Sequence, residues 1–131
     1  MEIGHLVNSY VILLFVLFFV KHFIIDFPLQ TPYQFMNKGT YGHPGGILHS
    51  GLHVIGTLLV FSIVFGFSSF AFLFMLAIGE GIAHYHIDWA KMNLNRHLDF
   101  QCNRDSGFWT LLGLDQFLHY VTYAVMITLL V

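Results

Sequence analysis

Long apolar runs constrain this chain more than any other feature, because four of them follow one another within 131 residues. A helix rises about 1.5 Å per residue, so about 20 apolar residues cross the roughly 30 Å hydrocarbon core of a bilayer. We therefore predict an all-α fold, a four-helix transmembrane bundle of up-down-up-down topology, in which residues 1–131 form a single integral membrane domain. The predicted spans are approximately 6–27, 47–67, 70–90 and 108–131.

The composition agrees with a membrane protein. Of the residues, 56% are hydrophobic and only 9% are charged, whereas a soluble domain carries about 25% charged residues. So few ionised side chains argue against a monomeric cytosolic protein. The single cysteine, Cys102, cannot form an internal disulfide, and a formal charge of −2 gives no nucleic-acid footprint.

The basic residues indicate an orientation. With four spans, the connections 28–46 and 92–107 lie on the same side, and every Lys and Arg falls at or beyond that side of the spans: Lys21, Lys38, Lys91, Arg96 and Arg104. The positive-inside rule places these connections in the cytoplasm and both termini on the non-cytoplasmic side. We therefore predict a protein of the bacterial inner (cytoplasmic) membrane. The proline- and glycine-rich connection 28–46 is predicted as a loop, and the short stretch Gly66-Phe67-Ser68-Ser69 is predicted as a tight turn.

Each predicted span carries ionisable residues four positions apart. The pairs are His22 and Asp26, His49 and His53, His84 and Asp88, and Asp115 and His119. Residues i and i+4 share one face of a helix, and each pair lies toward the cytoplasmic end of its span. The topology therefore brings the pairs to one depth, where charges cost several kcal/mol unless they are compensated.

Metal coordination is the most economical form of that compensation. Imidazole and carboxylate ligands suit Zn²⁺, Fe²⁺ and Mn²⁺, and helix bundles hold metals with such inward-facing pairs. We therefore predict divalent metal ions, with zinc preferred and iron or manganese as alternatives. The predicted ligands are His22, Asp26, His49, His53, His84, Asp88, Asp115 and His119. A buried proton relay or hydrogen-bond network is the alternative interpretation.

Two other polar residues are candidate catalytic residues. Glu80 lies one turn deeper than His84, and the roles of general base, metal ligand and partner of a ligand all remain open for it. Lys91 lies seven residues beyond His84 and so faces the same side, where it can bind a substrate anion or extend to the headgroups. Thr57 and Tyr123 continue the inward faces of their spans and can donate hydrogen bonds near the ligands.

The motifs together resemble an uncharacterised family of small polytopic membrane proteins of bacteria and their phages, over nearly the whole chain. They read His22-x-x-x-Asp26-Phe27-x-x-Gln30, His49-x-x-x-His53, His84-x-x-x-Asp88-x-x-Lys91 and Asp115-Gln116-x-x-His119. More remotely, they are similar to inner-membrane metal-dependent hydrolases and to the all-helical zinc phospholipase C and P1 nuclease group. That similarity implies metal-assisted phosphoester hydrolysis. The soluble members hold a third metal with an N-terminal Trp, whereas this chain begins with Met1 on the opposite side of the membrane, so a dinuclear centre is expected.

We therefore expect a membrane-embedded metal-dependent hydrolase that acts on a phosphoester at the cytoplasmic face. The expected partners are membrane lipid and a small-molecule or lipid phosphoester, and small-residue faces at Gly51 and Gly56 could support a homo-oligomer. One alternative is a di-iron membrane oxidoreductase, although denser histidine boxes such as HxxHH are absent. Another is a non-enzymatic metal or proton carrier or a subunit of a complex, although the apolar stretches 12–20, 60–65 and 70–78 leave no visible exit path.

Overall fold

The computed structural model describes residues 2–66 and 69–131, and this part of the chain forms five helices and no strand. The prediction of an all-α fold is therefore confirmed. One helix is short, α2 (Pro32–Asn37). The four long helices are α1 (Glu2–Asp26), α3 (Pro44–Phe65), α4 (Phe70–Leu98) and α5 (Ser106–Leu130).

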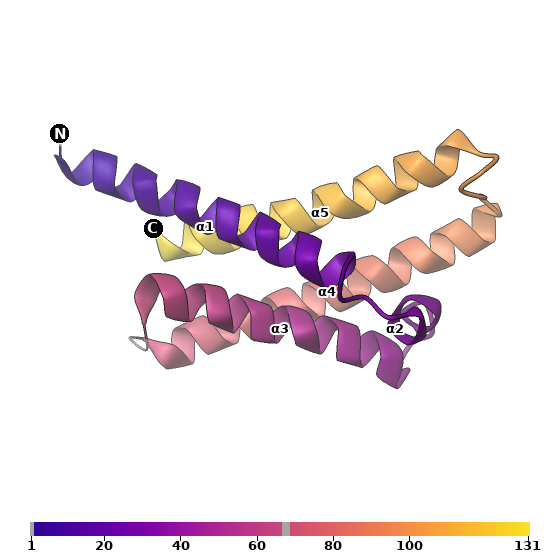
Figure 1. The fold of residues 1–131 in the computed structure, drawn as a ribbon, viewed down its shortest axis with the longest axis horizontal. Helices are drawn as coiled ribbons and strands as arrows, with labels where there is room; N and C mark the ends of the chain where they lie inside the picture. Colours follow the sequence, from indigo (N-terminus) through magenta and orange to yellow (C-terminus); the bar gives the residue numbers. More distant parts are fainter. Residues whose placement is uncertain (1, 67–68) are drawn as a thin grey trace.

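The long helices contact one another in the order α1, α3, α4, α5 and back to α1, and α2 packs against α3. Both termini lie at one end of the molecule, together with the end of α3 and the start of α4 (Figure 1). The short helix α2 and the connection between α4 and α5 lie at the opposite end. The helix ends that carry the paired ionisable residues therefore lie at the α2 end.

Within the described residues, three helices are long and apolar enough to cross a membrane: the α1 segment Ser9–Asp26, α3 and α4. These helices identify a membrane protein. The fourth predicted span differs, because α5 is long enough but is not among the three. Asp115, Gln116 and His119 interrupt its apolar sequence and lower its mean hydropathy.

Two predicted connections contain more helix than expected. α4 continues beyond the predicted end at residue 90 because residues 91–98 contain neither Gly nor Pro, and it ends where Asp99 adopts a left-handed φ of 53°. α2 forms inside the predicted loop, since Thr31 and Gln34 cap its start reciprocally and Pro32 occupies its first turn. The predicted tight turn at 66–69 lies partly outside the described residues.

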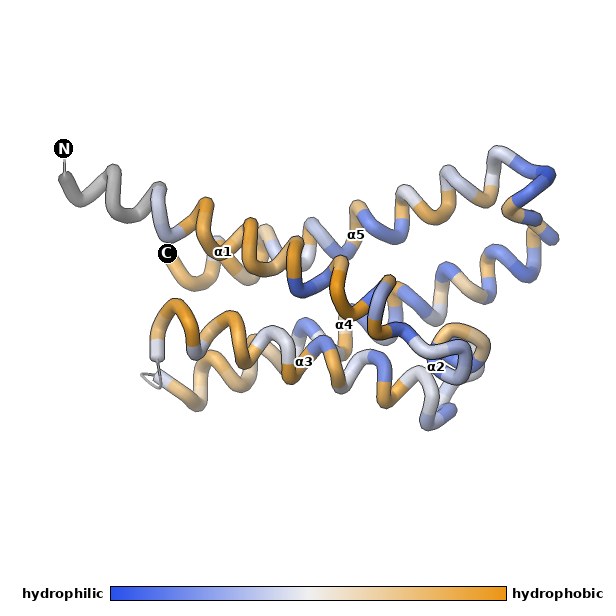
Figure 2. The backbone as a smooth tube through the Cα atoms, in the orientation of Figure 1, coloured by the Kyte–Doolittle hydropathy of each residue, from blue (hydrophilic) through white to orange (hydrophobic). Residues whose placement is uncertain are grey.

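An apolar core fills the half of the molecule near the termini, where Leu14, Phe18, Phe61 and Ala77 are all but fully buried. The ring of Phe18 stacks on Tyr123 with the centroids 5.0 Å apart. Figure 2 shows this half as mostly hydrophobic, whereas hydrophilic positions concentrate toward α2 and the start of α5. The core thus holds the helices together on one side of a polar cluster.

Candidate metal centre

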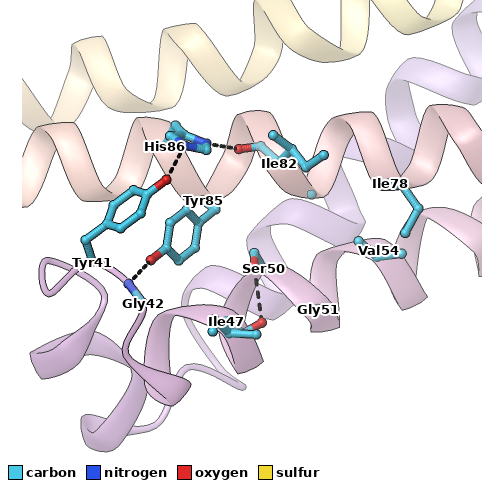
Figure 3. Close-up of a pocket in the computed structure, with 11 residues that line it drawn as sticks. Tyr41, Gly42, Ile47, Ser50, Gly51, Val54, Ile78, Ile82, Tyr85 and His86 are labelled. Atoms are coloured by element: carbon cyan, nitrogen blue, oxygen red, sulfur yellow. Dashed lines mark hydrogen bonds between the residues drawn. The ribbon is translucent and has the colours of Figure 1, made fainter.

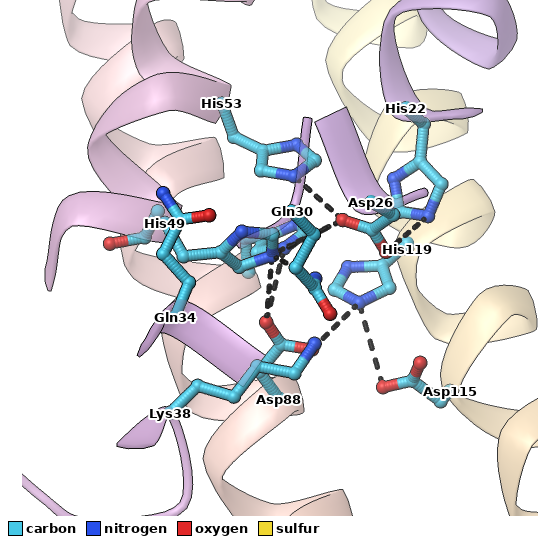
Figure 4. A network of polar contacts seen from close by, with 12 residues as sticks. His22, Asp26, Gln30, Gln34, Lys38, His49, His53, Asp88, Asp115 and His119 are labelled. Carbon is cyan, nitrogen blue, oxygen red and sulfur yellow. Dashed lines mark hydrogen bonds and ion pairs between the residues drawn. The ribbon is translucent and has the colours of Figure 1, made fainter. Parts of the chain in front are cut away.

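The structure brings all eight predicted ligands together in the interior. Each is at most 9% exposed, and their side chains converge from the four long helices (Figure 4). One pair comes from each helix, because the spacing of four residues puts both members on its inward face. The pairs are His22 and Asp26 on α1, His49 and His53 on α3, His84 and Asp88 on α4, and Asp115 and His119 on α5.

The largest group among the described residues consists of Asp26, His49, His53 and His84, each of which offers one ligand atom within 4.8 Å of the others. Asp26 Oδ1 lies 2.8 Å from His53 Nε2, 3.2 Å from His49 Nε2 and 3.7 Å from His84 Nε2. The Nε2 atoms of His49 and His84 are 3.2 Å apart. Four potential donor atoms from three helices therefore surround one point.

These spacings fit a tetrahedral metal site. Zinc binds imidazole nitrogen and carboxylate oxygen at about 2.0–2.2 Å, so neighbouring ligand atoms in a tetrahedron are roughly 3.3–3.6 Å apart. The four distances given above run from 2.8 to 3.7 Å and bracket that value. The buried His and Asp side chains could therefore hold a metal ion.

A second possible ligand group lies beside the first and consists of Asp88, Asp115 and His119. Asp88 Oδ2 lies 3.3 Å from Nε2 of both His49 and His84. Its other oxygen, Oδ1, lies 3.8 Å from His119 Nε2, which is in turn 3.6 Å from Asp115 Oδ1. The two oxygens of one carboxylate thus face two neighbouring groups.

Glu80 lies on the opposite side of the imidazole rings from Asp26. Its Oε1 is 3.9 Å from Nδ1 of His53 and 3.9 Å from Nδ1 of His84. Lys21 Nζ donates to Oε1 at 3.0 Å, and Thr57 Oγ1 donates to Oε2 at 3.1 Å. Glu80 therefore faces the backs of two imidazoles with its own oxygens already engaged.

The two sides of the histidine rings make different demands on the ring proton. At 3.9 Å from Glu80 Oε1, the buried Nδ1 atoms of His53 and His84 form no hydrogen bond. Without a metal, His53 Nε2 donates to Asp26 Oδ1 at 2.8 Å. A cation bound between the Nε2 atoms and Asp26 would instead require the protons of His53 and His84 on Nδ1, on the side of the Glu80 carboxylate.

His22 is held from both sides of its ring. His22 Nδ1 and Tyr123 Oη are 2.9 Å apart, and Tyr123 Oη lies 3.4 Å from Glu80 Oε1. His22 Nε2 lies 3.0 Å from Gln116 Oε1 and 3.1 Å from Asp26 Oδ2. Both oxygens accept hydrogen bonds, so without a metal Nε2 carries the proton and Nδ1 accepts from the tyrosine hydroxyl. Thr57 bonds to Glu80 and Tyr123 bonds to His22, so the prediction that both bond near the ligands is confirmed.

Sequence reasoning placed the lysines at the ends of the spans, but all three are buried, and two of them pair with carboxylates of the cluster. Lys21 pairs with Glu80, and Lys38 Nζ lies 3.0 Å from Asp88 Oδ1. The apolar face of α1 could have revealed Lys21, because Leu14, Phe18 and Ile25 share its face at helical spacing. No sequence signal marked Lys38, which the fold of the α1–α3 connection brings inward.

Two hollows reach the candidate ligands from outside. One of about 500 Å³ lies at the α1–α2 connection and is lined by Asp26. The other, of about 250 Å³, lies between α4 and α5 and is lined by Lys91 and Asp115. A third hollow of about 420 Å³ between α3 and α4, where Tyr41 and Tyr85 bond to α4 and the α2–α3 connection, contains no candidate ligand (Figure 3).

Residues 14–131 match the model of a family described as protein of unknown function (DUF3307). The matched range contains all eight candidate ligands together with Glu80 and Lys91. No curated protein and no solved structure matches the chain. The comparisons agree with the resemblance to an uncharacterised family and give no support to the remoter similarity to hydrolases.

Proposed function

The chain belongs to the DUF3307 family of proteins of unknown function, and we propose that it is a membrane-embedded, metal-dependent hydrolase of phosphoesters. The observation that carries the proposal is the convergence of three histidine nitrogens on Asp26 Oδ1 while Glu80 lies behind two of the rings. A proton network alone satisfies Asp26 Oδ1, which accepts from His53 Nε2 at 2.8 Å, but leaves the buried Nδ1 atoms of His53 and His84 without a hydrogen-bond partner. A divalent cation on the Nε2 side would place the ring protons on Nδ1, toward the carboxylate of Glu80.

We propose a dinuclear centre with Asp88 as the carboxylate between the two ions. In support, its two oxygens face different ligand groups. The first ion would be held by Asp26, His49, His53 and His84, and the second by Asp88, Asp115 and His119, with His22 at their border. Zinc is the preferred ion because the distances in the first group fit tetrahedral N/O coordination. Two divalent ions supply a nucleophilic water of lowered pKa and polarise a phosphoryl oxygen.

The charge of the cluster supports an anionic substrate. Among the described residues, four buried carboxylates (Asp26, Glu80, Asp88 and Asp115) face three buried ammonium groups (Lys21, Lys38 and Lys91). With neutral imidazoles the protein therefore contributes one net negative charge. Even one divalent cation makes the site positive, so an anion such as a phosphoester would be attracted.

We assign separate roles to the remaining polar side chains. Glu80 orients His53 and His84, because it lies behind their rings and is held by Lys21. It is thereby placed away from the Nε2 side, where the reacting water would lie. A carboxylate nearer the cytoplasmic ends of the helices would accept the proton of that water. Asp115 is suited to this role because its buried Oδ1 has no hydrogen-bond partner. Lys91 would bind the substrate anion.

We further propose that α5 crosses the membrane with α1, α3 and α4, which together form a four-helix bundle. Its polar residues face the cluster, where Asp115 and His119 are 3% and 2% exposed, so they do not meet lipid. The basic residues place the site at the cytoplasmic face of a bacterial inner membrane and both termini on the other side. The substrate phosphoester would then lie at headgroup depth.

Hydrolysis of p-nitrophenyl phosphate and bis(p-nitrophenyl) phosphate by the detergent-purified protein tests the proposal. We expect turnover that a chelator removes and added Zn²⁺ restores. His53→Ala should lose it, whereas His97→Ala should keep it, because the exposed His97 lies in the last turn of α4, outside the cluster. A metal-loaded wild type that is no more active than His53→Ala on either compound contradicts the proposal.

A further inference from the structure

The groove between α4 and α5 runs from the outer surface of the helices to the edge of the polar cluster. Three leucines at its mouth, Leu94, Leu114 and Leu118, are 40–49% exposed, whereas Leu111 in its interior is only 8% exposed. Ile87 and Ala90 complete the apolar wall. An apolar chain can therefore enter from the side of the molecule that a membrane would cover.

A buried cation lies at the inner end of this groove. Lys91 is 9% exposed, yet within the described residues its ammonium makes no hydrogen bond and no ion pair within 4.0 Å. Lys21 and Lys38 differ, because each has a carboxylate at 3.0 Å. An ammonium that is buried without a partner is costly, and this one faces a space that a ligand can enter. An anion that enters this space could therefore pair with Lys91.

The other hollows lack this combination. The hollow between α1 and α3 also contains a lysine, but Lys21 is engaged by Glu80 and Tyr123. The hollow between α3 and α4 is apolar and is lined by no ammonium group. Only the groove between α4 and α5, among the hollows given above, joins apolar walls, a free cation and a candidate metal ligand, Asp115.

We propose that this groove binds a lipid phosphate, with its hydrocarbon chain against the leucines and its phosphate on Lys91. Charge complementarity selects the headgroup, and the apolar walls select the chain. The inference rests on the proposed function, because the phosphate would then lie beside the group formed by Asp88, Asp115 and His119. It names the class of substrate, a phosphate ester of a long-chain alcohol, that enters laterally from the bilayer.

The proposal is tested by measuring the binding of dodecyl phosphate to the purified protein with native mass spectrometry in an uncharged detergent. This measurement does not depend on catalytic turnover. Phenyl phosphate is the control that has a phosphate ester but no long chain, and the dodecyl chain of the detergent is the control that has no phosphate. We expect dodecyl phosphate to remain bound and to bind at least about tenfold more tightly than phenyl phosphate, since several methylene groups are buried.

Two substitutions address the two halves of the groove. Lys91→Gln should weaken dodecyl phosphate binding by about tenfold or more, because a charge-assisted hydrogen bond is lost, while Lys91→Arg should retain it. Ala90→Phe should fill part of the groove and weaken dodecyl phosphate binding by a similar factor. Ala71→Phe is its matched control, because Ala71 is an exposed alanine on the same helix at the opposite end.

The outcomes separate this inference from the proposed function. If Lys91→Gln and Ala90→Phe both bind dodecyl phosphate as the wild type does, or if the wild type does not bind it, the groove proposal is overturned even if p-nitrophenyl phosphate is hydrolysed. If binding depends on both positions but no metal-dependent hydrolysis occurs, the groove proposal stands and the proposed function fails. Should Lys91→Gln not fold, the pair Ala90→Phe and Ala71→Phe decides alone.

Discussion

His49 Nε2 and His84 Nε2 face each other across α3 and α4 at 3.2 Å. Each neutral imidazole has one N–H and one lone pair, so two such nitrogens at this distance share at most one hydrogen bond. Both also lie 3.3 Å from the same oxygen of Asp88. A separation of 3.2 Å also fits two ligands of one metal ion, and the predictions about metal binding that follow depend on it.

The role of Glu80 as the residue that orients two ligands can be measured directly. Replacing Glu80 with Gln removes the carboxylate that faces both Nδ1 atoms, and we expect the Zn²⁺ dissociation constant to rise about 10- to 100-fold. The visible spectrum of the Co²⁺-loaded protein should also change, because the rings are no longer held in one orientation. Competition with a chromophoric chelator gives the affinity.

The matched control is Asp99→Asn, which makes the same change of charge at an exposed residue outside the cluster. It should leave both the affinity and the spectrum unchanged. An affinity in Glu80→Gln equal to that of the wild type would show that Glu80 does not act on the ligands.

The buried pair of Lys21 and Glu80 makes a prediction about stability. Lys21→Met leaves Glu80 without its cation at a site 2% exposed, so the metal-free protein should lose about 3–5 kcal/mol of unfolding free energy. The double variant Lys21→Met with Glu80→Gln should recover most of that loss, since no unpaired charge remains. Unfolding in mixed micelles, followed by circular dichroism, measures both. Equal losses in the single and double variants would contradict the prediction.

The two glycines that flank Glu80 form a matched pair. A Cβ at Gly81 would collide with Val54 of α3, whereas a Cβ at Gly79 would meet nothing within 4 Å. Gly81→Ala should therefore destabilise the protein by about 1–3 kcal/mol, and Gly79→Ala should be neutral or stabilise it by up to about 1 kcal/mol. Val54→Ala should partly rescue Gly81→Ala. A loss of unfolding free energy in Gly79→Ala together with no loss in Gly81→Ala would refute this packing of α3 against α4.

Much of the cluster could be predicted from sequence because helical periodicity is a local property. The spacing of four residues puts His49 and His53 on one face whatever surrounds them, and apolar length places that face inside a membrane protein. The role of Glu80 could not be predicted, because it depends on which side of the imidazole rings the carboxylate reaches. That orientation follows from the packing of α1, α3 and α4 and is not encoded by spacing.

The connections were predicted less well. Thr31-Pro32-x-Gln34 is a capping-box sequence with Pro in the first turn, so α2 had a local signal that the surrounding prolines and glycines obscured.

Gly56 was predicted as part of a small-residue face that could contact a second copy of the chain. In the structure it lies against Lys21 and Ile25 of α1 within the same chain. Such contacts depend on the three-dimensional arrangement of the helices.

The most direct test of the metal centre is the metal content of the detergent-purified protein, measured by elemental analysis for the wild type, His53→Ala, Asp88→Asn and the control His97→Ala. We predict one to two equivalents of a divalent metal, with zinc foremost, in the wild type and in His97→Ala, and a loss in the other two variants while circular dichroism still reports a folded helical protein. Wild-type protein without stoichiometric metal, or equal metal content in all four proteins, would contradict the account.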